Sequence, residues 1–219
     1  PAELHAPRSA WPTGPNGGKP EARGQVADAI AGPGFPGADD GRVRLVPLAP
    51  AALRALDAGD GDAADRLTGA AWPRPLVPPP LVGEHLAFLA DRLATEGPGS
   101  GWWNWAIVAG DPGRTRGMIG LGGPPGEDAA VEVGYSLYPE ARGCGFATAA
   151  LRMVVAIALA MPRVCVARVT ADPDNVDSIR VAERAGMARA GVRAGPGGGS
   201  VVVLEAIGRV VAAETLRRS

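Results

Sequence analysis

The sequence has few of the residues that carry metal, redox and imidazole chemistry. It contains two cysteines and two histidines. Cys144 and Cys165 are too few for the disulfide framework of a small secreted domain, and no cysteine or histidine pair has the spacing of a zinc site. His5 and His85 lie outside the motifs described below, which argues against imidazole catalysis and a histidine-rich metal site. We therefore expect no metal ion, and a reducing cytoplasm as the compartment.

The sequence also lacks long basic runs and long apolar runs. Its formal net charge is −1, whereas an electrostatic grip on nucleic acid requires several phosphates to be neutralised by Lys and Arg. The longest apolar run, Met153–Met161, is far shorter than the roughly 20 residues that cross a bilayer, and no basic-then-apolar stretch opens the sequence. We expect neither nucleic acid nor a membrane as a partner. The run is interpreted as a largely buried helix with Thr148 and Arg152 on its wetter flank.

The composition is otherwise that of a globular domain, with 46% hydrophobic and 21% charged residues in a chain long enough for one well-filled core. Residues 1–41 differ, because they are rich in Pro and Gly and ordering them would cost more entropy than burial returns. We interpret them as a flexible leader, either dispensable or a partner-binding arm anchored by Trp11 and Phe35. The folded domain is expected over 42–207, followed by a fraying tail over 208–219.

One stretch combines a strand, a glycine-rich turn and an apolar helix. It reads VEVGYSLYPEARGCG from Val131 and continues into FATAALR. Backbone N–H groups at a helix start are unpaired, and glycines without a Cβ allow an anion to approach them. The spacing Arg142-x-x-Gly145-x-Ala147 is neither the lysine-containing nucleotide loop nor the three-glycine dinucleotide fingerprint. We therefore predict a diphosphate-binding turn, with Gly145 open to the anion and the chemistry taking place away from the phosphates.

A second motif follows about thirty residues later. After the strand-like Val164–Thr170 the chain reads NVDSIRVAERAGM from Asn175. Together the two motifs resemble the GNAT superfamily of acyl-CoA-dependent N-acyltransferases, whose signature is (Arg/Gln)-x-x-Gly-x-(Gly/Ala) and whose next helix opens with Asn. The residues of the two motifs are most similar to those of the branch that contains the ribosomal-protein N-terminal (alanine/serine) acetyltransferases. The resemblance covers roughly 42–207 and implies an α/β fold with a mixed, mostly antiparallel, splayed sheet flanked by helices.

Apolar periodicity and turn residues predict the order of the elements around these motifs. In the resembled fold, the helix over 81–95 roofs the acceptor pocket. The terminal strands are expected to pair as a hairpin around the glycine-rich 194–199. The predicted elements are a strand over 42–48, helices over 51–58, 62–68 and 81–95, strands over 103–107 and 117–121 joined by the Asp111-Pro-Gly turn, and strands over 188–192 and 200–207.

The resemblance implies an acetyl-CoA-dependent N-acetyltransferase that works by direct attack of a primary amine, without an acyl-enzyme and without a metal. The amine would belong to a protein N-terminus or to a small molecule such as a polyamine or an aminoglycoside. A homodimer is conceivable through exposed strands beside Trp102–Trp105. The predicted contacts to acetyl-CoA are Leu137, Arg142, Gly143, Cys144, Gly145, Phe146, Ala147, Thr148 and Asn175.

Glu132 is the candidate general base. In a strand it points to the same side as Gly134 and Ser136, opposite Val131 and Val133. The functional interpretation is that it takes a proton from the acceptor amine, directly or through a water. The alternative is an ordinary solvent-facing carboxylate.

Ser178 is the candidate proton donor to the departing thiolate. Many members of the family have a tyrosine seven residues after the asparagine, where this chain has Ala182. Ser178 lies one turn earlier on the same helix face and can supply or relay the proton, although Asn175 and Ser178 also suit an N-cap and its third helical residue. The missing tyrosine, with Met187 where phenylalanine is usual, leaves open a catalytically weakened acyl-CoA-binding or regulatory module. Cys144 occupies a variable slot of the motif, where a mixed disulfide with CoA is conceivable.

Overall fold

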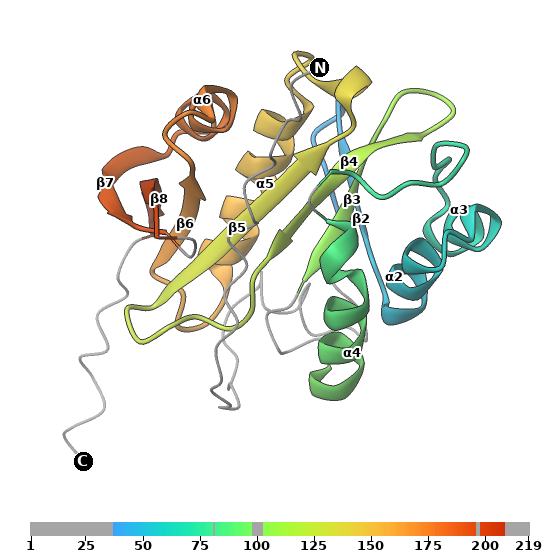
Figure 1. The fold of residues 1–219 in the computed structure, drawn as a ribbon, viewed down its shortest axis with the longest axis horizontal. Coiled ribbons are helices and arrows are strands. Elements are labelled where there is room, and N and C mark those ends of the chain that lie inside the picture. Colours follow the sequence, from blue (N-terminus) through green and yellow to red (C-terminus); the bar gives the residue numbers. More distant parts are fainter. Residues whose placement is uncertain (1–36, 81, 98–102, 196–197, 209–219) are drawn as a thin grey trace.

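An eight-stranded sheet passes through the molecule and carries helices on both faces (Figure 1). The computed structural model describes residues 37–80, 82–97, 103–195 and 198–208. Every neighbouring pair of strands in it is antiparallel except β5 with β6, so the predicted mixed, mostly antiparallel α/β sheet is confirmed. In the order in which they lie side by side, the strands are β1 (Ala38–Asp39), β2 (Arg44–Pro47), β3 (Asn104–Ala109), β4 (Arg114–Leu121), β5 (Ala130–Leu137), β6 (Val166–Ala171), β8 (Ser200–Ile207) and β7 (Ala188–Ala194).

Helix α5 (Phe146–Ala160) covers one face of the sheet. Its small and branched residues are buried against alternate residues of the central strands, as expected when successive strand residues point to opposite faces. Helix α6 (Val176–Arg184) joins this layer through Ile179 and Ala182. The core on this face includes Trp105, Ile107, Ile119, Leu121, Val131, Val133, Ala150, Leu151, Val154 and Ala158.

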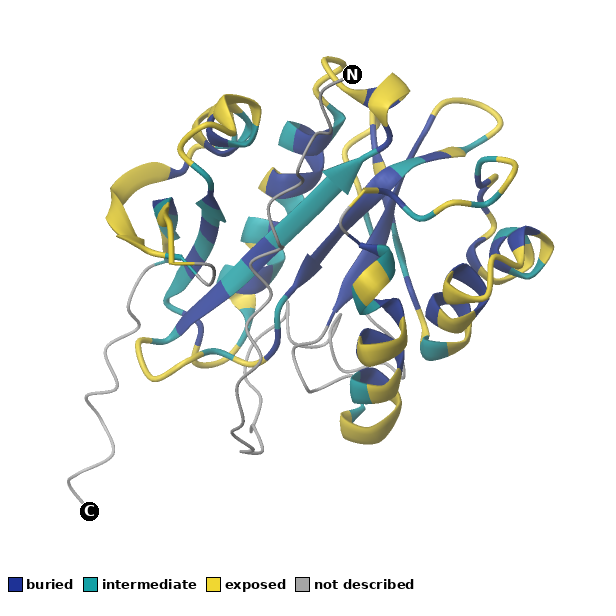
Figure 2. Cartoon of the chain, in the orientation of Figure 1, coloured by how far each residue is buried: buried dark blue, intermediate teal, exposed yellow. Residues whose placement is uncertain are grey.

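The opposite face carries α2 (Pro50–Asp57), α3 (Gly61–Thr68) and α4 (Leu86–Glu96), with short 3-10 turns at Gly83–His85 and Pro139–Ala141. Figure 2 shows these helices buried on their inner sides and exposed on their outer sides. Because α2 and α4 are amphipathic, they bury only one stripe of apolar residues. This second core contains Leu53, Leu56, Leu86 and Leu89, packed with Ala106, Val108 and Met118 of the sheet.

The parallel pair β5–β6 is short, and the two strands then separate. Ala130, Val131 and Glu132 pair with Val166, Ala167 and Arg168, and no further pair joins these strands among the described residues. Strand β5 continues to Leu137 and stays paired with β4, whereas β6 continues to Ala171 paired with β8. The sheet therefore opens into a wedge immediately beyond Glu132.

Several boundaries differ from those expected from the sequence. Ala38 and Asp39, within the stretch assigned to the leader, form β1 on the edge of β2, while residues 1–36, with Trp11 and Phe35, lie outside the described residues. The third helix, α4, starts at Leu86 instead of residue 81. Trp103 and Trp105 are buried, and β3 lies between β2 and β4, while Trp102 lies outside the described residues. The homodimer stays a prediction. In the described part of the chain, every helix is too short or too polar to cross a membrane.

Candidate active site

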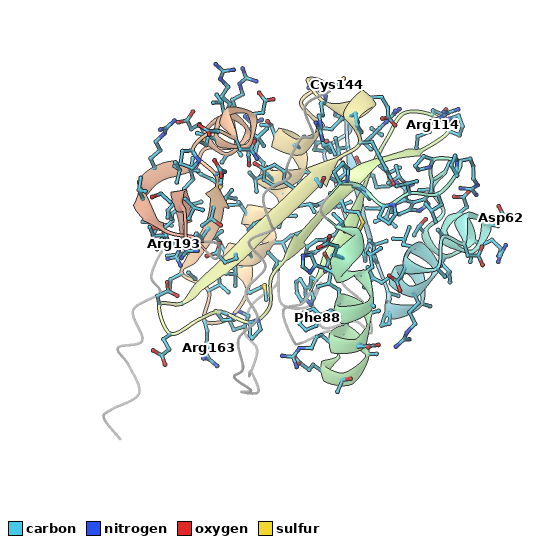
Figure 3. All side chains as sticks on the ribbon, viewed as in Figure 1. Asp62, Phe88, Arg114, Cys144, Arg163 and Arg193 are labelled. Carbon is cyan, nitrogen blue, oxygen red and sulfur yellow. The ribbon has the colours of Figure 1, made fainter. Side chains whose placement is uncertain are left out.

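The glycine-rich turn lies at the end of β5, where Figure 3 labels Cys144. Residues 142–145 are exposed, and Gly143 and Gly145 have φ values of 72° and 78°, which favour glycine. Helix α5 begins directly after Gly145 without a side-chain cap. The backbone N–H groups of residues 143–148 have no hydrogen-bond acceptor in the described residues. They lie before α5 or in its first turn, where N–H groups have no partner within the helix. These amides and the positive end of α5 form an open site for an anion.

Arg42 contacts the turn through its guanidinium group. Its guanidinium donates a hydrogen bond to the carbonyl of Cys144 and lies over the Phe146 ring, 5.9 Å from the centroid. Arg116 of β4 approaches the same ring at 5.6 Å. A Cβ at Gly145 would meet Arg42 Nη2 at 3.3 Å, whereas a Cβ at Gly143 would meet nothing within 4 Å. The space that a side chain at residue 145 would enter is therefore lined by Arg42, whereas the corresponding space at Gly143 is open; the predicted approach of the anion to Gly145 stays a prediction.

The unpaired edge of β5 leads from this turn into the wedge. The Glu132 carbonyl accepts a hydrogen bond from the N–H of Gly122, just after β4, and the Tyr138 N–H donates to the Arg116 carbonyl of β4. Alternation therefore directs the backbone groups of Tyr135 and Leu137 to the other edge, where β6 has separated. A linear chain bearing amide groups can pair with such an edge as an added strand would. Leu137, predicted to contact the acyl carrier, lies on this edge.

Glu132 lies at the closed end of the wedge, within a cluster of charges from five segments. Its Oε1 is 2.7 Å from Arg193 Nη2 and 3.8 Å from Arg168 Nη1. Arg168 also pairs with Asp128 at 2.8 Å and with Glu205 at 2.7 Å. The Glu132 side chain is 18% exposed, so it is not the ordinary solvent-facing carboxylate of the alternative interpretation.

Burial is the largest influence on Glu132 and raises the pKa of its carboxyl group, against the opposing effects of the Arg193 hydrogen bond and the two positive charges. A carboxylate with a raised pKa is a stronger base than a free one. Glu132 shares its face with Ser136, which lies beside Met118 of the second core, so it faces the side of the sheet that carries α4.

Ser178 forms a hydroxyl pair with Tyr135 across the wedge. The Tyr135 hydroxyl is 2.9 Å from both the carbonyl oxygen and Oγ of Ser178. Tyr135 belongs to the face of β5 that packs toward α5, opposite Glu132. Burial raises the pKa of Tyr135 to about 12, so its hydroxyl stays protonated at neutral pH. Glu132 and the Tyr135–Ser178 hydroxyl pair thus flank the wedge from its two faces.

Asn175 acts as the N-cap of α6. Its side-chain oxygen accepts a hydrogen bond from the Ser178 N–H at 3.2 Å, which matches the capping interpretation. The cap holds the first turn of α6, and with it Ser178, next to β5. The predicted cofactor contact of Asn175 stays a prediction.

The structure thus brings most of the predicted residues to one wedge and adds three that the sequence analysis missed. Tyr135 lies on the face of β5 opposite Glu132, with the apolar Val131 and Val133, and no local signal marks a role for its hydroxyl group. Arg42 falls in the predicted strand over 42–48, and Arg193 falls between the two predicted strands of the terminal hairpin. The contacts of Tyr135 and Arg193 join residues 43 and 61 positions apart, and that of Arg42 joins residues 102 apart. Cys144 is an exposed free thiol. No group of three or more His, Cys, Asp or Glu in the described residues could hold a metal ion.

Comparison with protein families gives a match over residues 42–188 to the family described as acetyltransferase (GNAT) domain. This range contains Arg42, the glycine-rich turn, both faces of the wedge and Ser178. It ends at the first residue of β7. A comparison with curated proteins found no match.

Solved structures of acetyltransferases share the fold. The ribosomal-protein-S5-alanine acetyltransferase from Vibrio fischeri has a TM-score of 0.55 and 14% identity, covering 80% of this chain and 97% of its own. A ribosomal L7/L12 alpha-N-protein acetyltransferase, RimL, in complex with coenzyme A has a TM-score of 0.54 and 14% identity, covering 77% and 96%. An aminoglycoside acetyltransferase in complex with coenzyme A and kanamycin has a TM-score of 0.50 and 22% identity, covering 75% and 94%.

Proposed function

Because this chain belongs to the acetyltransferase (GNAT) family, we propose that it transfers an acetyl group from acetyl-CoA to a primary amine. The observation that carries the proposal is the wedge between β5 and β6, which has bare amides at its open end and a partly buried carboxylate at its closed end. The diphosphate of acetyl-CoA binds the amides of residues 143–148, and Arg142 adds positive charge. The pantetheine arm then follows the free edge of β5 into the wedge.

In the proposed reaction the neutral amine attacks the thioester carbonyl carbon from the side of Glu132. A C–N bond forms, the carbonyl electron pair moves to oxygen, and a backbone N–H of β5 stabilises the oxyanion. The intermediate loses its N–H proton to Glu132 and expels the CoA thiolate as the carbonyl is restored. The thiolate receives a proton from water, either directly or through Ser178, which takes a proton from water in turn, so that amide and free CoA are the products.

The acceptor is proposed as the α-amine of a peptide N-terminus. At pH 7 an α-amine with pKa near 7.8 loses its proton at a cost of about 1.1 kcal/mol, whereas a lysine-like amine near 10.4 costs about 4.6 kcal/mol. Two observations support this acceptor: the residues of the two motifs resemble those of the ribosomal-protein branch, and the fold is shared with two ribosomal-protein acetyltransferases. The fold shared with the aminoglycoside acetyltransferase keeps small-molecule amines as the competing class.

A weakened acyl-CoA-binding module is the second candidate, and one observation favours it. Ala182 occupies the place of the usual tyrosine and is fully buried, so α6 presents no hydroxyl from that position. Met187 is likewise a buried core residue and carries no chemistry of its own. In this candidate the wedge binds acetyl-CoA without turnover.

Release of free CoA thiol from acetyl-CoA separates these candidates. The acceptors to be tested are an alanine-starting peptide, a peptide with an acetylated N-terminus and one lysine, spermidine and kanamycin. We expect thiol release that depends on the amine, is fastest for the alanine-starting peptide and yields the acetylated product by mass. Saturable binding of acetyl-CoA with no thiol release for any amine would instead support the module.

A further inference from the structure

Two arginines contact Glu132, and they differ in how they are held. Arg168 is 16% exposed and is fixed by Asp128 and Glu205, so its 3.8 Å approach to Glu132 is an ion pair without a hydrogen bond. Arg193 is 46% exposed and donates a hydrogen bond to Glu132 at 2.7 Å. Glu132 therefore has one direct hydrogen-bond donor among the described side chains, and this donor comes from β7.

Both contacts use the same carboxylate oxygen. Oε1 accepts the hydrogen bond of Arg193 and forms the ion pair with Arg168. Oε2 accepts no hydrogen bond from the described residues, and it is not among their buried polar atoms that lack a partner. A carboxylate held through one oxygen keeps the lone pairs of the other for a new donor. The arrangement thus leaves Oε2 for an incoming N–H group.

Arg193 lies outside the part of the chain that matches the family. The match ends at residue 188, and Arg193 belongs to the β7–β8 hairpin that follows it. Figure 3 labels Arg193 where this hairpin curls beside β6. Strand β7 is the last strand of the sheet, and the long side chain of Arg193 reaches from it to Glu132 of β5.

We propose that Arg193 is a positioning residue of the active site, which holds Glu132 as a carboxylate through Oε1 and leaves Oε2 to take the proton of the acceptor amine. The inference rests on the proposed role of Glu132 as base. When the tetrahedral intermediate gives its N–H proton to Oε2, the Arg193 hydrogen bond to Oε1 stays in place. The neutral carboxyl group then returns the proton to solvent, so no proton is gained or lost by the enzyme over a cycle.

The sign of the pH effect follows from the groups around Glu132. Asp128 and Glu205 are negative and favour protonation of Glu132, while Arg168 and Arg193 are positive and favour the carboxylate. Replacing Arg193 with glutamine removes one positive charge and the direct donor, so Glu132 is protonated at higher pH. The carboxylate, and the activity that depends on it, is then lost as the pH falls.

The first test compares kcat/KM across pH for Arg193→Gln and the parent protein with the best acceptor of the amine panel. Their ratio cancels the titration of the amine itself. We expect the ratio to fall by roughly two- to fivefold in all as the pH drops from 8 through the titration of Glu132, as suits a half-exposed ion pair. Arg189→Gln is the matched control, because Arg189 also lies on β7 but pairs with Glu183 at 2.7 Å. Its ratio is expected to stay flat.

A second readout is independent of turnover. The carboxyl carbon of Glu132, assigned by its absence in Glu132→Gln, is titrated by NMR in the parent and in each variant. Arg193→Gln should raise the midpoint, Arg193→Lys should keep it near that of the parent, and Arg189→Gln should leave it unchanged. An unmoved midpoint in folded Arg193→Gln, or equal shifts in both glutamine variants, would overturn the inference. An inactive parent with the expected midpoints would instead count against the proposed function alone.

Discussion

At the scale of single residues, the wedge separates Glu132 from the Tyr135–Ser178 hydroxyl pair. The Tyr135 and Ser178 hydroxyls are both weaker acids than a thiol, whose pKa is near 8.5, and burial raises the pKa of Tyr135 to about 12. Moving the Tyr135 proton outright to the thiolate would cost about 5 kcal/mol, and an aliphatic hydroxyl such as that of Ser178 is no better an acid, so the pair is suited to relay a proton from water. A phenol has one proton, so Tyr135 donates it either to the Ser178 carbonyl or to Ser178 Oγ. Only the second arrangement frees the serine proton, so we infer that Tyr135 orients Ser178.

Tyr135→Phe should therefore lower kcat by roughly fivefold and leave the KM for acetyl-CoA nearly unchanged, because about 1 kcal/mol of hydrogen bonding is lost. Tyr138→Phe is the matched control, since Tyr138 is also buried but bonds to the Val77 carbonyl at 2.9 Å, away from Ser178. Steady-state kinetics of the two variants checks this. Equal losses of kcat in both would mean that the tyrosine hydroxyls serve packing and stability only.

Glu132→Gln should affect amines according to their pKa. For an acceptor of high pKa, which needs the base, we expect kcat to fall by roughly 10²–10⁴-fold, and for an α-amine by less than about tenfold. The comparison uses the alanine-starting and lysine-containing peptides with one enzyme preparation. Glu205→Gln disturbs the same charge cluster through Arg168 but retains the base, so it should not discriminate between the two peptides. A small and equal effect of Glu132→Gln on both amines would contradict the assignment.

At the scale of elements, the strand, turn and helix from β5 to α5 could be predicted because their signals are local. Alternation defines β5, two glycines define the turn, and an apolar run defines α5. The separation of β5 from β6 is implied by the family resemblance, whereas the face on which Glu132 lies follows from the alternation of strand residues. The partners of Glu132 and Ser178 could not be predicted, since Arg193 and Tyr135 reach them across strands. Nothing in the sequence near Arg193 indicates that its hairpin folds back toward β5.

The turn offers a matched pair of substitutions. Gly143→Ala and Gly145→Ala impose a similar backbone strain, because both positions have positive φ. At Gly143 the new methyl group points into open space, where we place the diphosphate, so affinity for CoA should fall with little further loss of stability. At Gly145 the methyl group meets Arg42, so thermal stability should fall more.

Calorimetric titration with CoA and thermal unfolding of both variants test this assignment. Combining Gly145→Ala with Arg42→Ala should give a smaller loss of stability than the sum of the single losses, because the methyl group then has room. Unchanged CoA affinity in Gly143→Ala would show that the anion does not use the open side of the turn.

At the scale of the whole molecule, the wedge divides one sheet into two halves. Strands β1–β5 form one half and β6–β8 the other, and in the described part of the chain three residue pairs join β5 to β6. Helix α5 bridges the halves on one face, and the Tyr135–Ser178 and Arg193–Glu132 contacts bridge them beside the wedge. A ligand that enters the wedge and bonds to both sides adds contacts that the unfolded chain lacks.

Binding of acetyl-CoA should therefore stabilise the protein as a unit. At a concentration 100 times Kd the gain is about 2.7 kcal/mol, which corresponds to a rise in Tm of roughly 5–10 °C for a chain of this size. Acetylated pantetheine without the diphosphate retains the contacts along β5 but loses those to the turn. At the same concentration it should raise Tm by less than about 2 °C. Comparable shifts from the two compounds would show that the turn contributes little, because the carrier would then be held by the β5 edge alone.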